Sequence, residues 1–319
     1  MIVDCHTHIW TRPEQLGRDA AAYLRRQSGR DDLPAGPEAH AAAAACVDKT
    51  LVLGYRSVSL AAAVPNDLVA EHVAGHSETM VGIAGIDPTE DGAVADAEEL
   101  LDRDEFRGLT VSPASQHFHP ADSRAMKLYE LAEQRRAPIF LHQGTHFRSA
   151  DRMEYARPQL LDEIAREFPA LTLVVASMGH PWVEECIALA GKHERVFAGL
   201  AGLIHRPWQA YNALVLAHQY NVMDKVLFGS DFPYMTAAEA IESVYRLYEV
   251  TQGTNLPSVP REKLRSVVER HALEQLGIAG EGDRAAEPAA AAEEADDEPG
   301  AEAELRGSAY GENEPESRS

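Results

Sequence analysis

The chain has 319 residues, of which 45% are hydrophobic, and this is enough for one large core or two ordinary ones. Its formal net charge of −22 disfavours a nucleic-acid partner, because phosphate binding needs a basic face. Three widely spaced cysteines do not suggest a disulfide framework. The chain starts with a strand pattern instead of a signal peptide, and no apolar run is long enough to span a bilayer. We therefore expect a cytoplasmic protein with no membrane partner.

Short apolar segments alternate with helical segments along most of the chain. The first strand and its turn occupy residues 1–8, and further strands are predicted at 50–54, 80–86, 106–111, 138–142, 171–176, 196–200 and 226–231. Helices are predicted at 17–27, 39–47, 65–76, 93–102, 122–135, 158–168, 181–191, 207–220, 236–250 and 261–276, and residues 112–120 read as a loop.

Apolar strands that alternate with helices indicate a parallel sheet buried on both faces. Eight such units favour a (β/α)₈ TIM-like barrel, an α/β fold, over residues 1–278, and a doubly wound open sheet is the alternative. The remainder, 279–319, is predicted to be a disordered acidic tail. From residue 281 onward it holds 13 acidic residues and 3 arginines, a net charge of −10, and almost no large apolar residue. A solvated tail is preferred to an acidic interaction arm.

His6 and His8 lie two residues apart at the end of the first strand, so their side chains point to the same face. On spacing alone, two ordinary hydrogen-bonded histidines are the preferred interpretation. His142 and Asp231 change this, because they also follow strands, the fifth and the eighth. Strands one and eight are neighbours in a closed barrel, so all four groups can converge there, whereas an open sheet would spread them apart.

Three imidazoles and one carboxylate suit a divalent metal ion, zinc first and manganese second. Such an ion would lower the pKa of a bound water to near neutrality and could polarise a substrate carbonyl. Asp231 has two candidate roles, metal ligand and acceptor of the proton that the water loses. Taken singly, Asp231 could equally be a turn residue, and His142 an ordinary histidine at a strand end.

These residues also carry a family resemblance. The segment Asp4-Cys5-His6-Thr7-His8 resembles the HxH signature of the amidohydrolase superfamily, and Phe228-Gly229-Ser230-Asp231-Phe232-Pro233 is similar to its FGSDxP motif. The chain looks most like the amidohydrolase-related branch that includes aminocarboxymuconate-semialdehyde decarboxylase. The resemblance covers roughly residues 1–278. It implies a barrel fold and implies that His6, His8, His142 and Asp231 hold the metal.

Two departures from this branch concern polar groups at the predicted mouth. The branch usually has a histidine where this chain has Ser177, and in relatives that histidine contacts the water or substrate and can act as a base. At the fourth strand the usual lysine and histidine are also absent, and Thr110 and Ser112 stand there. We expect an altered substrate or reaction, or lost activity, with Ser177 and Thr110 facing the substrate.

Loops that follow the strands build the site of a barrel enzyme, so their polar residues are further candidates. His146 and Arg148 follow the fifth strand, and Arg148 could hold a substrate carboxylate, although a surface ion pair is an equal alternative. His180 could supply the missing base, with packing at a helix start as the alternative. His205 and Arg206 form a similar case after the seventh strand.

The sequence thus predicts a metal-dependent enzyme that acts on a small carboxylic acid, lactone or amide. Hydrolysis by activated water is the first expectation, with Asp231 and His180 as catalytic residues. Non-oxidative decarboxylation is the second, since the family does both, and a non-catalytic metal-binding relative is the third. The substrate, the metal and the formation of a homo-oligomer stay open.

Overall fold

The computed structural model describes residues 1–144 and 148–280. Within these residues, one eight-stranded parallel sheet has the order β1-β2-β5-β6-β7-β8-β9-β10. Its strands are β1 Val3–Thr7, β2 Lys49–Leu53, β5 Met80–Gly85, β6 Phe106–Val111, β7 Ile139–Leu141, β8 Leu173–Val175, β9 Val196–Gly199 and β10 Val226–Leu227. The predicted strands are confirmed in number and order among the described residues.

The sheet closes between its first and last strands. The amide of Cys5 donates to the carbonyl of Phe228 at 3.0 Å, and the amide of Asp231 donates to the carbonyl of His6 at 3.0 Å. The amide of His8 also donates to the carbonyl of Phe232 at 2.9 Å. These bonds continue the strand pairing around the sheet, so the structure is the predicted (β/α)₈ barrel and not an open sheet.

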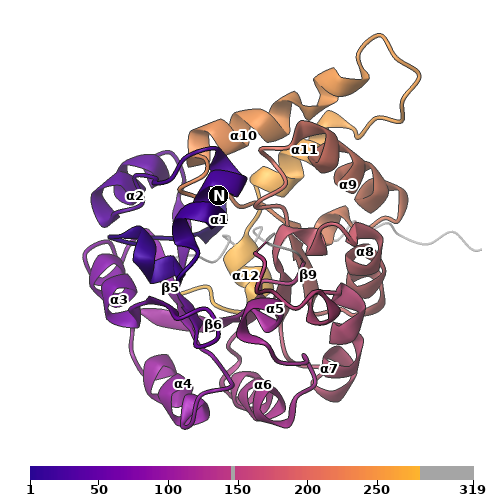
Figure 1. The fold of residues 1–319 in the computed structure, drawn as a ribbon. Helices are drawn as coiled ribbons and strands as arrows, with labels where there is room; N and C mark the ends of the chain where they lie inside the picture. Colours follow the sequence, from indigo (N-terminus) through magenta and orange to yellow (C-terminus); the bar gives the residue numbers. More distant parts are fainter. Residues whose placement is uncertain (145–147, 281–319) are drawn as a thin grey trace, which may run out of the picture. The chain divides into compact units, whose positions relative to one another are not determined.

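Helices surround the strands in Figure 1, and most occupy the predicted segments. The α-helices are α1 Ala20–Ser28, α2 Pro37–Ala44, α3 Asn66–Ala74, α4 Ala93–Leu101, α5 Pro113–Gln116, α6 Ser123–Arg135, α7 Asp162–Glu167, α8 Val183–Lys192, α9 Pro207–Gln219, α10 Ala237–Arg246, α11 Arg261–Val268 and α12 Ala272–Leu276. Short 3₁₀ segments are η1 Pro13–Leu16, η2 Met153–Tyr155, η3 Pro158–Leu161, η4 Ala176–Gly179, η5 Met223–Lys225 and η6 Leu247–Thr251. Proline at the first turn of α2 and α9 fits their starts, because its fixed φ is helical and its missing N–H needs no partner there.

Apolar side chains pack in two separate clusters, as expected for a barrel. The smaller cluster fills the barrel interior with side chains from the strands, among them Leu51, Ile83 and Phe140, and α12 closes it with Leu273 and Leu276. The larger cluster lies between the outer faces of the strands and the helices. The packed interior leaves the carboxyl ends of the strands as the place where polar side chains gather.

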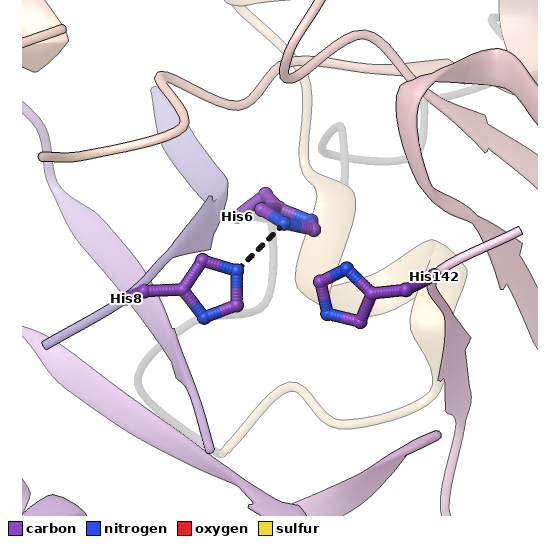
Figure 2. A group of neighbouring side chains, drawn as sticks. All are labelled: His6, His8 and His142. Carbon is purple, nitrogen blue, oxygen red and sulfur yellow. Dashed lines mark hydrogen bonds between the residues drawn. The ribbon is translucent and has the colours of Figure 1, made fainter. Parts of the chain in front are cut away.

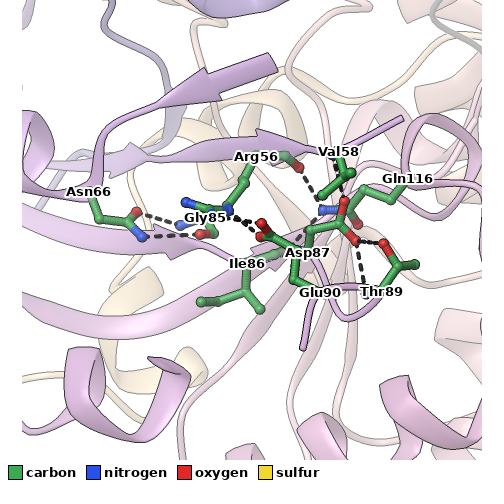
Figure 3. Close-up of polar contacts among 9 residues, drawn as sticks. All are labelled: Arg56, Val58, Asn66, Gly85, Ile86, Asp87, Thr89, Glu90 and Gln116. Carbon is green, nitrogen blue, oxygen red and sulfur yellow. Dashed lines mark hydrogen bonds and ion pairs between the residues drawn. The ribbon is translucent and has the colours of Figure 1, made fainter. Parts of the chain in front are cut away.

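Two features differ from the prediction. The segment 112–120, predicted as a loop, contains the short helix α5, and residues 55–64 hold an unpredicted antiparallel hairpin, β3 Tyr55–Ser57 and β4 Ala62–Val64. Local polar contacts explain both, as Figure 3 shows. The side-chain amide of Gln116 donates to the carbonyls of Arg56 and Ile86, both at 2.7 Å, and the carboxylate of Asp87 accepts from the amide of Val58 at 2.9 Å. The hairpin is thereby tied to the ends of β5 and β6.

A pair of buried histidines joins α2 and α3 behind the barrel wall. The hydroxyl of Thr7 donates to the carbonyl of Leu51 at 2.7 Å, so it can only accept from Nε2–H of His40, at 2.9 Å. Nδ1 of His40 then accepts from Nε2–H of His72, also at 2.9 Å. Burial, and then the neighbouring histidines, lower the pKa of His40 to about 3 and that of His72 to about 4, so both are neutral near pH 7.

Some predictions concern residues that the structure does not describe. His146 and the acidic tail, apart from residues 279–280, lie outside the described residues. In the part of the chain that is described, each helix is too short or too polar to cross a bilayer.

Candidate metal centre

His6 and His8 project from the carboxyl end of β1, and His142 follows β7 directly. Figure 2 shows the three rings turned toward one common point. The Nε2 atoms of His6 and His8 lie 3.1 Å apart, and one ligand nitrogen from each of the three rings lies within 4.8 Å of the others. Among the described residues, this is the only group of three or more potential ligand side chains with such spacing.

The hydrogen bonding of His8 presents Nε2 as a ligand. Its Nδ1 lies 3.0 Å from the carbonyl oxygen of Leu53, which can only accept, so Nδ1 carries the proton and Nε2 carries a lone pair. Two nitrogen ligands of one tetrahedral zinc ion lie about 3.3 Å apart, close to the separation between His6 and His8. The residues present therefore fit a divalent ion that prefers nitrogen ligands.

Asp231 stands beside these rings because the backbone turns sharply there. Its φ of 60° is left-handed, a strained conformation that often occurs at functional sites. The carboxylate Oδ1 lies 3.9 Å from Nε2 of His6. Gly229 allows the chain after β10 to pack closely against β1, since a Cβ at position 229 would lie only 2.8 Å from the Cβ of His6.

The carboxylate of Asp4 ties the two strand ends together below the rings. Its Oδ1 accepts from the amide of Ser230 at 2.9 Å and from the amide of His6 at 3.3 Å. Burial raises the pKa of Asp4 to about 6 although these bonds oppose the shift. Burial also raises the pKa of Asp231 to about 7, against the opposing charge of Arg206. A bound cation would favour the ionised form of Asp231.

A cavity opens above the histidines, and most predicted site residues line it. Its walls include all four predicted metal ligands together with His180, Ser177 and Arg148. Ser177 has a left-handed backbone with a φ of 51°. Its Oγ packs against Gly202. A Cβ added to Gly202 would lie only 2.6 Å from that oxygen and 3.4 Å from Oδ2 of Asp231, so glycine leaves the space that both groups use. The position where the resemblance would place a histidine therefore holds a small hydroxyl on the cavity wall, close to Asp231.

Thr110 differs from this group. It is buried in β6 at 2% exposure and is absent from the cavity wall, and among the described residues its hydroxyl has no hydrogen-bond partner. Alternate side chains of β6 point into the barrel, so Thr110 lies in the packed interior. The prediction that it binds substrate is not supported by this position.

Arg148 lines the cavity in a fixed position. Its Nη1 donates to the carbonyl of Leu16 at 2.7 Å and to the carboxylate of Asp19 at 2.9 Å. Its guanidinium stacks 3.9 Å from the ring centre of Tyr23, a cation–π contact. Nε and Nη2 make no hydrogen bond to the described residues. Arg148 is therefore both a buried anchor for the segment after β1 and a candidate for a substrate anion.

Tyrosines on the cavity wall were missed by the sequence interpretation. Tyr23 comes from α1, Tyr55 from the hairpin and Tyr234 from the loop after β10. The sequence interpretation gave none of them a role in the site, and the tertiary fold brings them together. His205 and Arg206, which the sequence placed near the mouth, also line the cavity.

Comparisons with known proteins agree with this architecture. The amidohydrolase family model Amidohydro_2 matches residues 3–265. A search of the curated proteins finds no match. Among solved structures, an uncharacterised TIM-barrel protein of Bordetella bronchiseptica is similar at 22% identity with a TM-score of 0.67, covering 86% of this chain and 99% of that one.

Two further structures have names that state a chemistry. A "probable 2-pyrone-4,6-dicarboxylic acid hydrolase" of Acinetobacter baumannii, solved with citric acid bound, is 14% identical with a TM-score of 0.62 and covers 86% of this chain and 99% of that one. A dihydroxybenzoic acid decarboxylase of Polaromonas sp. JS666, solved with manganese and the inhibitor 2-nitroresorcinol, is 14% identical with a TM-score of 0.59. The match covers 88% of this chain and 98% of that one.

At these identities the solved structures establish the fold alone. The family model, in contrast, spans most of the chain and includes His6, His8, His142 and Asp231. The resemblance inferred from the motifs is thereby confirmed, and the chain belongs to the amidohydrolase family that this model describes.

Proposed function

We propose that the chain is a metal-dependent hydrolase of a small carboxylic acid, lactone or amide. The observation that carries this proposal is the convergence of His6, His8 and His142 beside Asp231 at the floor of a cavity. The three histidines and Asp231 would hold the ion. When bound, it would activate a water molecule and polarise a substrate carbonyl. Zinc suits the imidazole-rich donor set best, and manganese is the second choice.

The chain's own residues have separate roles in this proposal. Asp231 would accept the proton from the attacking water and later give it to the leaving group. Burial, and then the charge of Arg206, lower the pKa of His180, so its imidazole is neutral near pH 7 and can also accept a proton. Arg148 would orient a substrate carboxylate through Nε and Nη2, while Nη1 keeps the guanidinium in place. Ser177 would contact the substrate as a small hydroxyl.

Non-oxidative decarboxylation is the second candidate. The structural similarity to a manganese-containing dihydroxybenzoic acid decarboxylase favours it, as do the tyrosine rings and the guanidinium of Arg148 on the cavity wall. A planar acid would find both stacking surfaces and a cation there.

One experiment tests the proposal and separates the two reactions. The protein, loaded with zinc or manganese, is screened on lactones, amides and aromatic acids in water enriched in ¹⁸O, and carbon dioxide is measured in parallel. Hydrolysis predicts ¹⁸O in the product without carbon dioxide, whereas decarboxylation predicts carbon dioxide. Turnover that is unaffected by chelation and by the Asp231→Asn substitution would contradict both.

A further inference from the structure

Arg206 lies on the cavity wall, and its hydrogen bonds within the described part of the chain go to neutral groups. It lies in the loop between β9 and α9, where its Nη1 donates to the carbonyl of Gly202 at 2.9 Å and its Nη2 donates to the side-chain oxygen of Gln27 at 3.1 Å. Both acceptors are neutral. Among the described residues, no carboxylate lies within 4.0 Å of the Arg206 guanidinium, unlike that of Arg148, which is paired with Asp19.

The position of Gly202 places this guanidinium near the metal centre. Gly202, whose carbonyl Arg206 contacts, packs between the hydroxyl of Ser177 and the carboxylate of Asp231. The electrostatic influence of Arg206 agrees with this placement. Burial is the largest cause of the pKa shifts of Asp231, His180 and His205; the charge of Arg206 then adds to the lowering at the two histidines and opposes the rise at Asp231.

The charges around the cavity contrast with those of the whole chain. Arg148, Arg206 and Asp231 are the described side chains with a formal charge on its wall, and Asp231 is a candidate metal ligand. A bound divalent ion would add to the positive charge of the two arginines on the wall, although the chain carries a net charge of −22. The net negative charge of the chain repels anions at long range. An anionic substrate must therefore be held by the cations inside the cavity. A half-buried guanidinium with only neutral partners gains most from an anion.

We propose that Arg206 binds the second anionic group of a small dicarboxylate whose first carboxylate or acyl group faces the metal histidines. This rests on the proposed function, because it assigns the substrate class of the same site. Arg206 contacts the carbonyl of Gly202, and Gly202 packs against Asp231, so a substrate that reaches both Arg206 and the metal histidines must be compact. The small hydroxyl of Ser177 leaves room for such a substrate. The guanidinium fork suits the planar carboxylate.

Two matched probe pairs test the proposal: benzoate against isophthalate, and butyrate against glutarate. Isothermal titration calorimetry gives their affinities for the full-length protein, with manganese and without it. We expect at least one dicarboxylate to bind about tenfold tighter than its monocarboxylate partner, the gain typical of a charged hydrogen bond. The difference should vanish in Arg206→Gln and partly return in Arg206→Lys.

The Arg152→Gln variant is the control for charge, because Arg152 is exposed and lies outside the cavity wall. It removes the same charge and should keep the preference. Circular dichroism and metal content establish that the Arg206 variants are folded and loaded. A wild type with no preference in either pair, or a preference that persists in Arg206→Gln, would overturn the assignment. A preference that depends on Arg206 in a protein without turnover would leave the assignment standing and overturn the proposed function instead.

Discussion

Two pairs of histidines in this barrel have almost the same ring geometry and different surroundings. The rings of His6 and His8 lie 4.9 Å apart at 82°, and those of His40 and His72 lie 5.0 Å apart at 75°. The nitrogen separations are 3.1 Å and 2.9 Å. The first pair faces the cavity from the end of β1, whereas the second lies behind the barrel wall between α2 and α3.

What differs is the next group that each pair meets. His40 continues to the hydroxyl of Thr7, so protein donors and acceptors complete that chain of hydrogen bonds. His6 and His8 meet a third imidazole, His142, and the carboxylate of Asp231 at 3.9 Å. Ring geometry alone therefore does not identify a metal site. A third donor, a carboxylate and access to a cavity separate the candidate ligands from a structural pair.

The largest effect should come from removing the third imidazole. His142→Ala should lower metal affinity by more than about a hundredfold and abolish turnover, since even the partners of metal ligands are worth tenfold to a hundredfold. His72→Ala, matched in chemistry, should keep about one ion per chain. Metal analysis after dialysis measures both. Equal metal content in the two variants would erase the distinction between the pairs.

Adding an imidazole beside the candidate ligands gives the second prediction. Ser177→His would fill the space next to Gly202 and Asp231. We expect turnover of the native substrate to fall by about tenfold, because forcing a larger side chain into a packed site costs about 1–3 kcal/mol and about 1.4 kcal/mol of lost substrate binding corresponds to tenfold. Comparing both proteins on acids, lactones and amides measures the change. A rise with every substrate would show that Ser177 marks a lost base instead of a reshaped pocket.

Breaking the structural pair should cost stability and not metal. His40→Ala removes two buried hydrogen bonds and leaves a cavity, so the free energy of unfolding should fall by about 2–4 kcal/mol. His76→Ala, at an exposed neighbouring site, removes one hydrogen bond at 3.0 Å to the carbonyl of His72 and should cost less, about 0.5–1 kcal/mol. Urea unfolding measures both variants. A folded His40→Ala protein that has lost its metal would contradict the purely structural role.

The same pair predicts a pH dependence of stability. The pKa values of His40 and His72, about 3 and about 4, lie below the value of 6.5 for an unperturbed histidine. Below pH 6.5 these histidines take up protons in the unfolded chain but stay neutral in the folded chain, so their contribution to stability falls as the pH falls. Each histidine contributes up to about 1.4 kcal/mol per pH unit. Burial raises the pKa of Asp4 to about 6 and that of Asp231 to about 7, so these two groups act in the opposite direction over the same range. The contribution of the pair is therefore the difference in slope between wild type and His40→Gln/His72→Gln, measured by urea unfolding of metal-free protein between pH 6.5 and 4.5, and equal slopes would refute it.

The barrel and its candidate ligands could be predicted because their signals are local. Apolar strands alternate with helices, and His6, His8, His142 and Asp231 each lie at or just past the carboxyl end of a strand, so closure of the sheet brings them together. The structure does not support the prediction that Thr110 binds substrate, because Thr110 does not line the cavity. Its place in the family pattern indicates the strand that carries it, but not how far the cavity extends.

Other parts depend on contacts between distant segments, which no local pattern encodes. The pairing of His40 with His72 joins two helices that look ordinary in the sequence. Tyr23 lines the cavity from the segment after β1, which Arg148 contacts at Leu16, Asp19 and the ring of Tyr23 itself. The charge of Arg206 could be read from the sequence, but its neutral partners, Gly202 and Gln27, could not.

The most direct test of the central claim is anomalous diffraction from crystals of the metal-loaded protein, recorded at the zinc and manganese absorption edges. We expect one peak at about 2.0–2.2 Å from Nε2 of His6 and Nε2 of His8, with His142 and Asp231 completing the coordination. No anomalous peak between these side chains in crystals that contain metal, or a peak at His40 and His72 instead, would contradict the assignment.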